Sequence, residues 1–475
     1  DIMLVGRQKE LEILNKAALD DKSHFIAIYG RRRIGKTYLV REAYNYSFTF
    51  SHAGLSNGNT KEQLYSFFSS LKDAGLKIKR QPRNWLEAFD YLKDLIKQST
   101  EKKKIIFLDE LSWMDTARSD LMMALESFWN GFASARKDVV LIVCASATSW
   151  ILSKVIHNKG GLYNRLTEQI HIEPFELNEC LNYVSKNNLC LNKEQILQFY
   201  MIFGGVPYYW DFIKKEFSLV QNIDNMLFKK DAPLKEEYQY LYASIFKNPE
   251  SYLKIIEVLA NKKIGLTRDE IIKETGIENT GSLSNKLEEL EVCGFIRKYN
   301  VLGNKKKNAL YQLIDPYTLF YHHFLKNYPS DEHFWANQIN TPKINTWMGL
   351  AFERLCFSHI KQIKKKLGIA SVLTEVYSWK TNADLDKGLI GSQIDMLIVR
   401  KDQVINLCEI KYSNSQYVID KETDIKIKTK VNDFIKASKT KYAIMPTLIT
   451  TYGLVDNAYS SIINYVVCME DLFES

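Results

Sequence analysis

The stretch "HFIAIYGRRRIGKTYLV", residues 24–40, decides the fold of the first half of the chain. A compact apolar run is followed by residues 30–37, which fit the pattern G-x-x-x-x-G-K-[ST], and then by residues with helical spacing. Between a strand and a helix, such a loop lets backbone N–H groups and the helix N-terminus surround phosphate groups. The stretch therefore predicts a P-loop with ATP and Mg²⁺ as cofactors.

Individual residues in and after this loop have separate expected roles. Lys36 would reach the β- and γ-phosphates, and Thr37 would hold Mg²⁺. A second apolar run, "IIFLDE" (105–110), places Asp109 as the other Mg²⁺ ligand and Glu110 as the base that orients the attacking water. The residues predicted to bind the nucleotide here are Gly30, Arg31, Arg32, Arg33, Ile34, Gly35, Lys36, Thr37, Tyr38 and Asp109.

The chain divides into segments with different patterns. Apolar runs of strand length alternate with helical segments up to residue 173, which predicts a largely parallel α/β sheet with both faces covered. Helical residues follow, and then three helices and a short basic hairpin, the sequence shape of a winged helix-turn-helix. A helix and further strands complete the chain. We predict an α/β multidomain protein with domains at 1–173, 174–245, 246–330 and 335–475.

Composition limits the class of protein. A chain of 475 residues is too long for one core, and a net charge of +8 gives a mild bias toward polyanions. The seven cysteines form no CxxC pair, which argues against disulfides and zinc and for a reducing compartment. No apolar run reaches the roughly 18 residues that span a bilayer, and the first residues mix acids and bases. We expect a cytoplasmic protein with no membrane partner.

A second kind of chemistry is predicted in "GSQIDMLIVRKDQVINLCEIKYS", residues 391–413. Side chains alternate along a strand, so Glu409 and Lys411 share one face while Ile410 points to the other. Asp395 precedes them on the other strand of the hairpin. Mg²⁺ held by Asp395, Glu409 and the carbonyl of Ile410 would pair the acids, and Lys411 would position a water that the metal activates. A plain salt bridge between Glu409 and Lys411 is the simpler alternative.

The winged-helix segment has two interpretations. "TGSLSNKLEELEVCGFI" (280–296) would be the recognition helix and "GNKKKN" (303–308) the tip of the wing. Glu288, Glu289 and Glu291 in the second half of that helix oppose contact with DNA phosphates. The segment is therefore either a DNA reader or a structural relay.

The stretches "MLVGRQKELEIL", "IYGRRRIGKT", "FLDELSWM" and "LIVCASATSWI" resemble the archaeal-type ATPases of the AAA+/STAND group, over roughly residues 1–330. The resemblance implies that Val5, Gly6 and Arg7 lie near the adenine and that Ser146 senses the γ-phosphate. It also implies an arginine finger or sensor at Arg165 and a helical lid closing through Pro207. Simpler roles stay open for three of these residues: a strand cap for Ser146, a surface salt bridge for Arg165 and a turn for Pro207.

"IDMLIV", a turn and "INLCEIKYS" are similar to the PD-(D/E)xK nuclease superfamily, whose core matches residues 340–450. The resemblance implies a restriction-endonuclease-like α/β domain with a further metal-binding carboxylate, Glu353 in "GLAFERLCF" (349–357). Gln393 and Ile394 stand before Asp395 where the superfamily pattern has Pro, a position that varies.

These features lead to one main hypothesis and two alternatives. The main hypothesis is an ATP-hydrolysing switch that controls a Mg²⁺-dependent DNA endonuclease domain. The first alternative is a nucleotide-dependent regulator whose nuclease-like domain is inactive and docks DNA or protein. The second is an ATP-driven translocase, which needs Arg165 to reach a neighbouring copy. DNA is the expected partner, while a homo-oligomer and a protein partner stay open.

Overall fold

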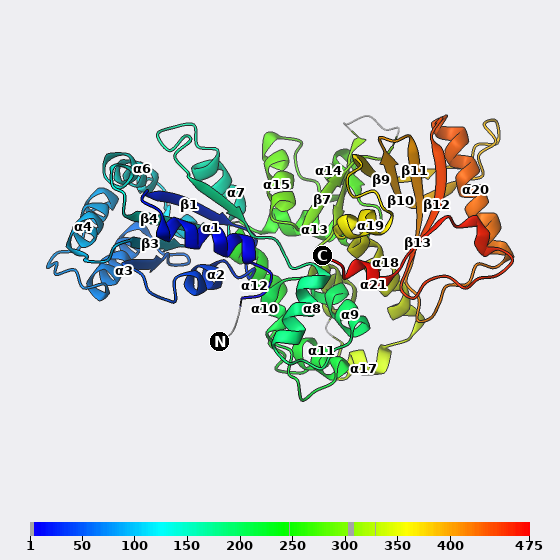
Figure 1. Ribbon diagram of the computed structural model, residues 1–475, viewed down its shortest axis with the longest axis horizontal. Helices are drawn as coiled ribbons and strands as arrows, with labels where there is room; N and C mark the ends of the chain where they lie inside the picture. Colours follow the sequence, from blue (N-terminus) through cyan, green and yellow to red (C-terminus); the bar gives the residue numbers. More distant parts are fainter. Residues whose placement is uncertain (1–3, 247, 303–307, 328) are drawn as a thin grey trace.

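The computed structural model describes residues 4–246, 248–302, 308–327 and 329–475. Along its longest axis the protein has an α/β domain at one end, a helical centre, and a second α/β domain at the other end (Figure 1). Most of the predicted wing tip, residues 303–307, lies outside the described residues. No helix within the described ranges combines the length and the apolar character that crossing a membrane requires.

The N-terminal domain contains a five-stranded parallel sheet in the order β2-β3-β4-β1-β5. Its strands are β1 (His24–Tyr29), β2 (Phe50–Ala53), β3 (Lys104–Asp109), β4 (Val139–Ala145) and β5 (Glu168–His171). Every residue of β3 and β4 is buried, as expected for parallel strands covered on both faces. Its helices are α1 (Gln8–Leu19), α2 (Lys36–Ala43), α3 (Thr60–Asp73), α4 (Trp85–Gln98), α5 (Leu111–Met114), α6 (Leu121–Gly131) and α7 (Thr148–Ile151). The predicted parallel α/β sheet is confirmed.

The helical centre begins after β5. Its helices are α8 (Leu177–Lys186), α9 (Lys193–Phe203), α10 (Pro207–Trp210), α11 (Leu219–Leu227) and α12 (Glu237–Ile245). Side chains of Asn192 and Ser218 accept hydrogen bonds at the starts of α9 and α11, which fixes where these helices begin.

A smaller unit, here called the three-helix unit, follows at residues 250–313. It contains α13 (Glu250–Ala260), β6 (Leu266–Thr267), α14 (Arg268–Thr275), α15 (Gly281–Val292), β7 (Ile296–Tyr299) and β8 (Leu310–Leu313). Its strands pair antiparallel in the order β6-β8-β7. Helix α15, the predicted recognition helix, contacts α7 of the N-terminal domain. Two short helices, α16 (Pro316–Phe320) and α17 (Phe334–Gln338), connect this unit to the C-terminal domain.

The C-terminal domain contains a mixed five-stranded sheet in the order β13-β12-β11-β10-β9. Its elements are α18 (Pro342–Ser358), α19 (Ile360–Lys366), β9 (Thr374–Thr381), β10 (Ser392–Arg400), β11 (Val404–Lys411), α20 (Lys421–Ser438), β12 (Ala443–Thr450), β13 (Tyr465–Val467) and α21 (Met469–Leu472). Strands β10 and β11 form the antiparallel hairpin that the sequence predicts, and β12 pairs parallel with β11.

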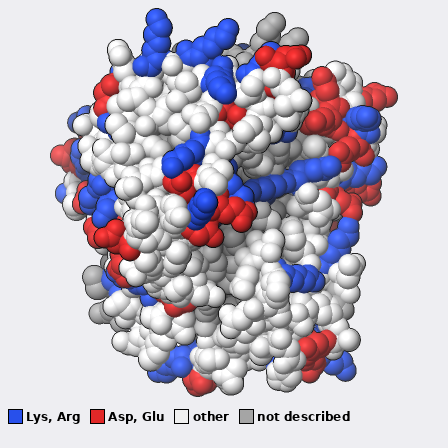
Figure 2. Space-filling model, turned by 90° about the vertical axis from the view of Figure 1, so that its right-hand side faces the viewer, with Lys and Arg blue, Asp and Glu red and all other residues white. Residues whose placement is uncertain are grey.

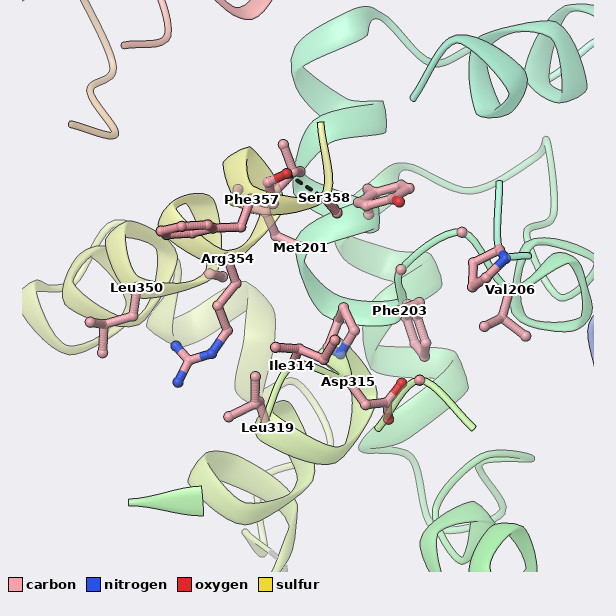
Figure 3. A pocket seen from close by; sticks show the side chains of 18 of the residues that line it. Met201, Phe203, Val206, Ile314, Asp315, Leu319, Leu350, Arg354, Phe357 and Ser358 are labelled. Atoms are coloured by element: carbon pink, nitrogen blue, oxygen red, sulfur yellow. Dashed lines mark hydrogen bonds between the residues drawn. The ribbon is translucent and has the colours of Figure 1, made fainter. Parts of the chain in front are cut away.

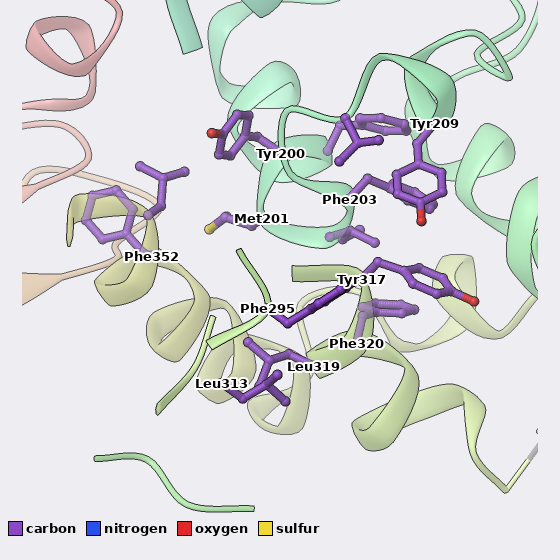
Figure 4. Packing of buried hydrophobic residues seen from close by; sticks show 14 of the residues in the cluster. Tyr200, Met201, Phe203, Tyr209, Phe295, Leu313, Tyr317, Leu319, Phe320 and Phe352 are labelled. Atoms are coloured by element: carbon purple, nitrogen blue, oxygen red, sulfur yellow. The ribbon is translucent and has the colours of Figure 1, made fainter. Parts of the chain in front are cut away.

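One hydrophobic core joins the helical centre, the three-helix unit and the C-terminal domain. Figure 4 shows Phe203 of α9, Phe295 before β7, Phe320 of α16 and Phe352 of α18 around the same junction. The predicted domain boundaries near residues 245 and 335 therefore fall within one shared core. A movement of one of these parts would displace side chains in the others.

Phe320 tests this shared core because it is fully buried and packs against Phe324, Trp335 and Trp347. Phe320→Ala should leave a cavity and lower the free energy of unfolding by about 3–5 kcal/mol. Urea unfolding followed by tryptophan fluorescence measures the change. Tyr240→Ala is the control because Tyr240 is 61% exposed, and its transition should stay at the wild-type midpoint.

Candidate functional sites

The loop between β1 and α2 has the backbone shape that phosphate binding requires. Gly30 has φ +151°, and a Cβ atom there would lie 2.3 Å from the carbonyl oxygen of Ile172, so only glycine fits. Gly35 has φ +92° and precedes the first residue of α2. The loop thereby leads into a helix N-terminus, where backbone N–H groups without helical partners attract anions.

Lys36 is held inside this loop. Its Nζ donates hydrogen bonds to the carbonyl oxygens of Gly30 and Arg31, both at 2.9 Å, and to Ser146 Oγ at 3.2 Å. Burial lowers the pKa of the Lys36 ammonium, and the charges of Glu110 and Asp109 oppose that change. A γ-phosphate would supply the anionic partner that the buried ammonium needs.

The ends of β3 and β4 bring the other polar groups to the same edge of the sheet. Thr37 Oγ1 donates to Asp109 Oδ2 at 2.5 Å, so the two predicted Mg²⁺ ligands already adjoin. Burial raises the pKa of Asp109, although the hydrogen bond from Thr37 opposes this. Ser146 donates to both carboxylate oxygens of Glu110, from Oγ at 2.6 Å and from its backbone N–H at 3.1 Å. The residues predicted as γ-phosphate sensor and as water-orienting base are therefore in direct contact.

A pocket of about 690 Å³ lies over the loop. The residues predicted for the nucleotide that line it are Val5, Arg7, Arg32, Arg33, Ile34, Gly35, Lys36, Thr37, Tyr38, Glu110, Ser146 and Pro207. Arg7 donates to the carbonyl oxygen of Glu173 at 2.8 Å, and its guanidinium lies 4.8 Å from the Phe175 ring, which places it between the N-terminus and the helical centre. Gly6 has φ +65°, a backbone shape that glycine adopts without strain.

Two loop arginines point toward other parts of the chain. Arg31 Nη1 forms a buried ion pair with Asp315 Oδ1 at 2.6 Å, next to the start of α16. Its side chain does not line the pocket, so the predicted nucleotide contact of Arg31 stays a prediction. Arg33 forms two hydrogen bonds with Glu237 of α12, at 2.7 and 3.0 Å, and lies over the Tyr208 ring. The P-loop is thereby tied to the helical centre.

Arg165 lies on the exposed surface and does not line the pocket. Its expected role as an arginine finger would require a neighbouring copy of the chain. Pro207 is the first residue of α10, where a residue without a backbone N–H costs nothing, and it lines the pocket.

Two of the three predicted acids of the C-terminal domain line one small cleft, here called the acid cleft, and the third, Glu409, lies on the neighbouring strand. Glu353 of α18 and Asp395 of β10 line it together, and Asp395 Oδ2 accepts a hydrogen bond from the backbone N–H of Ile410 at 3.2 Å. Glu409 lies on the adjacent strand, with Lys411 Nζ 3.7 Å from its Oε2. The hairpin thus brings Asp395 beside the Glu409–Lys411 strand, as predicted.

Lysine side chains form ion pairs with the carboxylates at this acid cleft. Lys263 of the three-helix unit places its Nζ 3.2 Å from Glu353 Oε1 and 3.9 Å from Asp395 Oδ1. Lys430 of α20 donates to Glu409 Oε1 at 2.5 Å. No group of three or more His, Cys, Asp or Glu side chains is arranged to hold a metal in the described part of the chain. Ammonium groups therefore stand where the sequence predicts a cation.

Burial and mutual repulsion govern the charges in the acid cleft. Burial, and then the neighbouring Asp395, raises the pKa of Glu353. Burial also raises the pKa of Glu409, although Lys430 opposes the change. Burial acts to lower the pKa of Lys411, but the charges of Glu409 and Asp395 outweigh it and raise the pKa. A cation that approaches these buried acids stabilises their ionised forms.

Sequence reasoning missed Lys263, Lys430, Asp315 and Glu237. Arg31 and Asp315 are 284 positions apart, so no local spacing connects them. Lys430 lies in "KTKVND" (428–433), a lysine-rich helix of the kind that usually faces solvent. Only the packing of α20 against β10 places its ammonium at Glu409.

Comparison with known proteins identifies the N-terminal part. Residues 4–211 match the family described as an ATPase domain predominantly from Archaea. An uncharacterized protein of Methanocaldococcus jannaschii is 23% identical over 421 residues, which are 87% of this chain and 88% of that protein.

Solved structures with P-loop domains are also similar to this chain. The Walker-type ATPase of Pyrococcus abyssi is 16% identical and covers 68% of this chain and 96% of its own, with a TM-score of 0.47. The ORC2 protein of Aeropyrum pernix, in complexes with ADPNP and ADP, is 13% identical and covers 75% of this chain and 96% of its own, with a TM-score of 0.44.

Mutation of Lys36 should weaken ATP binding, whereas mutation of Arg31 should lower the stability of the fold. Lys36→Ala should fold normally and lose about 100-fold or more in ATP affinity, because a charge-assisted contact to phosphate is removed. Arg31→Met should leave Asp315 buried without its partner and lower the free energy of unfolding by about 3–5 kcal/mol, with ATP affinity near that of the wild type. Calorimetric ATP titration and chemical unfolding separate the two effects. A large loss of ATP affinity in Arg31→Met would contradict this assignment.

Proposed function

We propose that this chain is an ATP-hydrolysing AAA+/STAND-type switch whose nucleotide state controls a Mg²⁺-dependent DNA endonuclease in its C-terminal domain. The observation that carries the proposal is a pair of ion pairs made by residues 263–315, which comprise most of the three-helix unit and the residue before α16. Arg31 of the P-loop pairs with Asp315, and Lys263 of the three-helix unit pairs with Glu353 of the acid cleft. Residues 263–315 therefore contact both the P-loop and the acid cleft.

The ATPase half follows from the pocket and from its archaeal-type domain. Lys36 and the loop N–H groups would bind the β- and γ-phosphates, and Glu110 would orient a water for in-line attack. Thr37 and Asp109 would hold Mg²⁺, which neutralises phosphate charge when bound. Ser146 forms hydrogen bonds with both Lys36 and Glu110. Loss of the γ-phosphate would therefore change the contacts of the Lys36 ammonium and the Glu110 carboxylate at the same time.

A change in the bound nucleotide can be transmitted to the rest of the protein through Arg31 and Arg33. Arg33 is bound to Glu237 of α12 and Arg31 to Asp315 before α16. Closing the loop on ATP would pull on both helices, and the shared core would pass the shift to α18, which carries Glu353. Helix α15 contacts α7, which favours the relay role for the three-helix unit over direct reading of DNA in this arrangement.

The nuclease half is proposed from the chemistry of the acid cleft. Asp395, Glu409, Glu353 and the carbonyl oxygen of Ile410 are the hard oxygen donors that would hold Mg²⁺, which supplies Lewis acidity toward a scissile phosphate when bound. Lys411 is 41% exposed and would position the attacking water. Burial makes the negative charges of Glu353 and Glu409 costly, so a divalent cation would stabilise them, but the acids would first have to move closer together than they are in the described residues.

The arrangement described here corresponds to a closed state of the proposed nuclease. Lys263 covers Glu353 and Asp395 from the three-helix unit, so a DNA strand has no route to them from that side. On the face that the C-terminal end turns to the viewer in Figure 2, basic side chains are mixed with acidic ones.

A second candidate function is a nucleotide-dependent regulator with an inactive nuclease-like docking domain. The observation in its favour is that Lys263 and Lys430 neutralise the acids without any metal. In that case the ion pairs would be permanent contacts between parts of the chain.

Lys263 distinguishes the two functions. Lys263→Ala should bind Mn²⁺ about fivefold more tightly than the wild type, because a half-exposed ion pair worth about 1 kcal/mol no longer competes with the metal. Lys262→Ala is the matched control, since Lys262 pairs with Glu274 of α14 and should leave Mn²⁺ affinity unchanged. Titration calorimetry measures the affinities. No Mn²⁺ binding by Lys263→Ala favours the docking function.

DNA cleavage tests the nuclease half itself. With Mg²⁺, ATP and plasmid DNA, Lys411→Ala should cleave at least about 100-fold more slowly than the wild type, because it loses the group that positions the attacking water. Lys430→Ala is a useful companion, because it frees Glu409 while keeping Lys411. Equal rates in the wild type and Lys411→Ala, or no cleavage by any of the three proteins, would remove the nuclease proposal and leave the ATPase half intact.

A further inference from the structure

A cavity of about 480 Å³ lies where the helical centre, the three-helix unit and α18 meet. It shares no lining residue with the nucleotide pocket. Apolar side chains make up most of its wall, among them Met201 and Phe203 of α9 and Leu319 of α16. Its volume lies within the range of roughly 300–1,000 Å³ typical of small-molecule sites.

Arg297 and Arg354 bring positive charge into this mainly apolar cavity, whose other charged lining residues are Arg31, Lys263, Glu173, Glu176 and Asp315. Figure 3 shows Arg354 extending from α18 toward Ile314 and Leu319, with Leu350 beside it. Its Nε donates to the carbonyl oxygen of Leu313 at 2.9 Å, and no hydrogen bond from its terminal nitrogens is found among the described residues. The terminal nitrogens of Arg354 are therefore available to a ligand.

Arg297 of β7 supplies the second charge. Its guanidinium lies 3.7 Å from the Phe357 ring, and its Nε donates to Gln312 Oε1 at 2.7 Å. Neither Arg297 nor Arg354 forms an ion pair with an Asp or Glu within the described residues, and the two guanidinium charges repel each other. Both arginines also line the acid cleft, where the charge of Glu353 acts on Arg354. Burial lowers the pKa of both groups to about 10.

Such an arrangement is costly without a ligand. Arg297 and Arg354 are half-buried, their charges repel each other, and Glu353 offsets only part of the positive charge at Arg354. An anion that reaches both guanidinium groups would therefore stabilise them together. Arginine presents a planar fork that matches the two oxygens of a carboxylate or phosphate. The aromatic and aliphatic wall suits a flat apolar body attached to that anion.

We propose that this cavity binds a small organic anion, in which a phosphate or carboxylate contacts Arg297 and Arg354 and an apolar or aromatic body fills the rest. The site lies between Arg31 of the P-loop and the helix that carries Glu353. The bound ligand would therefore stabilise the contact between the three-helix unit and α18. This inference goes beyond the proposed switch and nuclease, and it holds whether or not the acid cleft cleaves DNA.

Three naphthalene probes test the proposal on the full chain without nucleotide, in the wild type and in Lys36→Ala, whose nucleotide pocket is impaired. The probes are 2-naphthyl phosphate, 2-naphthoate and uncharged 2-naphthol, and calorimetry measures their affinities. At least one anionic probe should bind about tenfold or more tightly than 2-naphthol, because charge-assisted hydrogen bonds form only with the anions. The comparison between phosphate and carboxylate identifies which anion the site prefers.

Variants assign the binding to the cavity. Arg354→Met and Arg297→Met should each abolish the preference for the anion, while Lys298→Met, an exposed neighbour on β7, should keep it. Leu350→Trp would fill the cavity with both arginines kept and should block all three probes. Thermal unfolding checks that each variant is folded. The proposal is overturned if no anionic probe binds more tightly than 2-naphthol, or if the preference survives in both folded arginine variants.

Discussion

The buried ion pair between Arg31 and Asp315 is the contact on which the architecture depends most. One partner belongs to the phosphate-binding loop and the other precedes α16, in the region that joins the three-helix unit to the C-terminal domain. Both side chains are withdrawn from water, so separating them within the protein would leave each as an uncompensated buried charge. The P-loop is therefore joined by a direct contact to the far half of the chain.

Competition between ammonium groups and a metal ion gives the acid cleft its proposed control. Lys263 comes from the three-helix unit and Lys430 from the helix after the hairpin, so the two neutralising charges sit on different parts of the fold. Moving the three-helix unit would uncover Glu353 and Asp395 while Lys430 stayed with Glu409. Repulsion among the uncovered acids would then favour a divalent cation in their place.

The sequence predicted what local chemistry determines. The P-loop pattern located Lys36, Thr37 and the strand-to-helix turn, and the alternation along β11 placed Glu409 and Lys411 on one face. It could not reveal Lys263 or Asp315, because their roles arise from contacts between segments far apart in the chain. Arg31 shows the limit most clearly. Its position inside a phosphate-binding motif suggested a nucleotide contact, whereas burial against Asp315 and Phe295 gave its side chain another partner.

The distance between the three-helix unit and the C-terminal domain tests the account most directly. Spin labels at Lys273 of α14 and Lys421 of α20, in a chain whose exposed Cys190 is replaced by serine, report that separation by pulsed electron paramagnetic resonance. ATP with Mg²⁺ should shift the distance distribution in the labelled wild type and leave it unchanged in the labelled Lys36→Ala variant. Identical distributions with and without ATP in the wild type would contradict nucleotide control of the acid cleft.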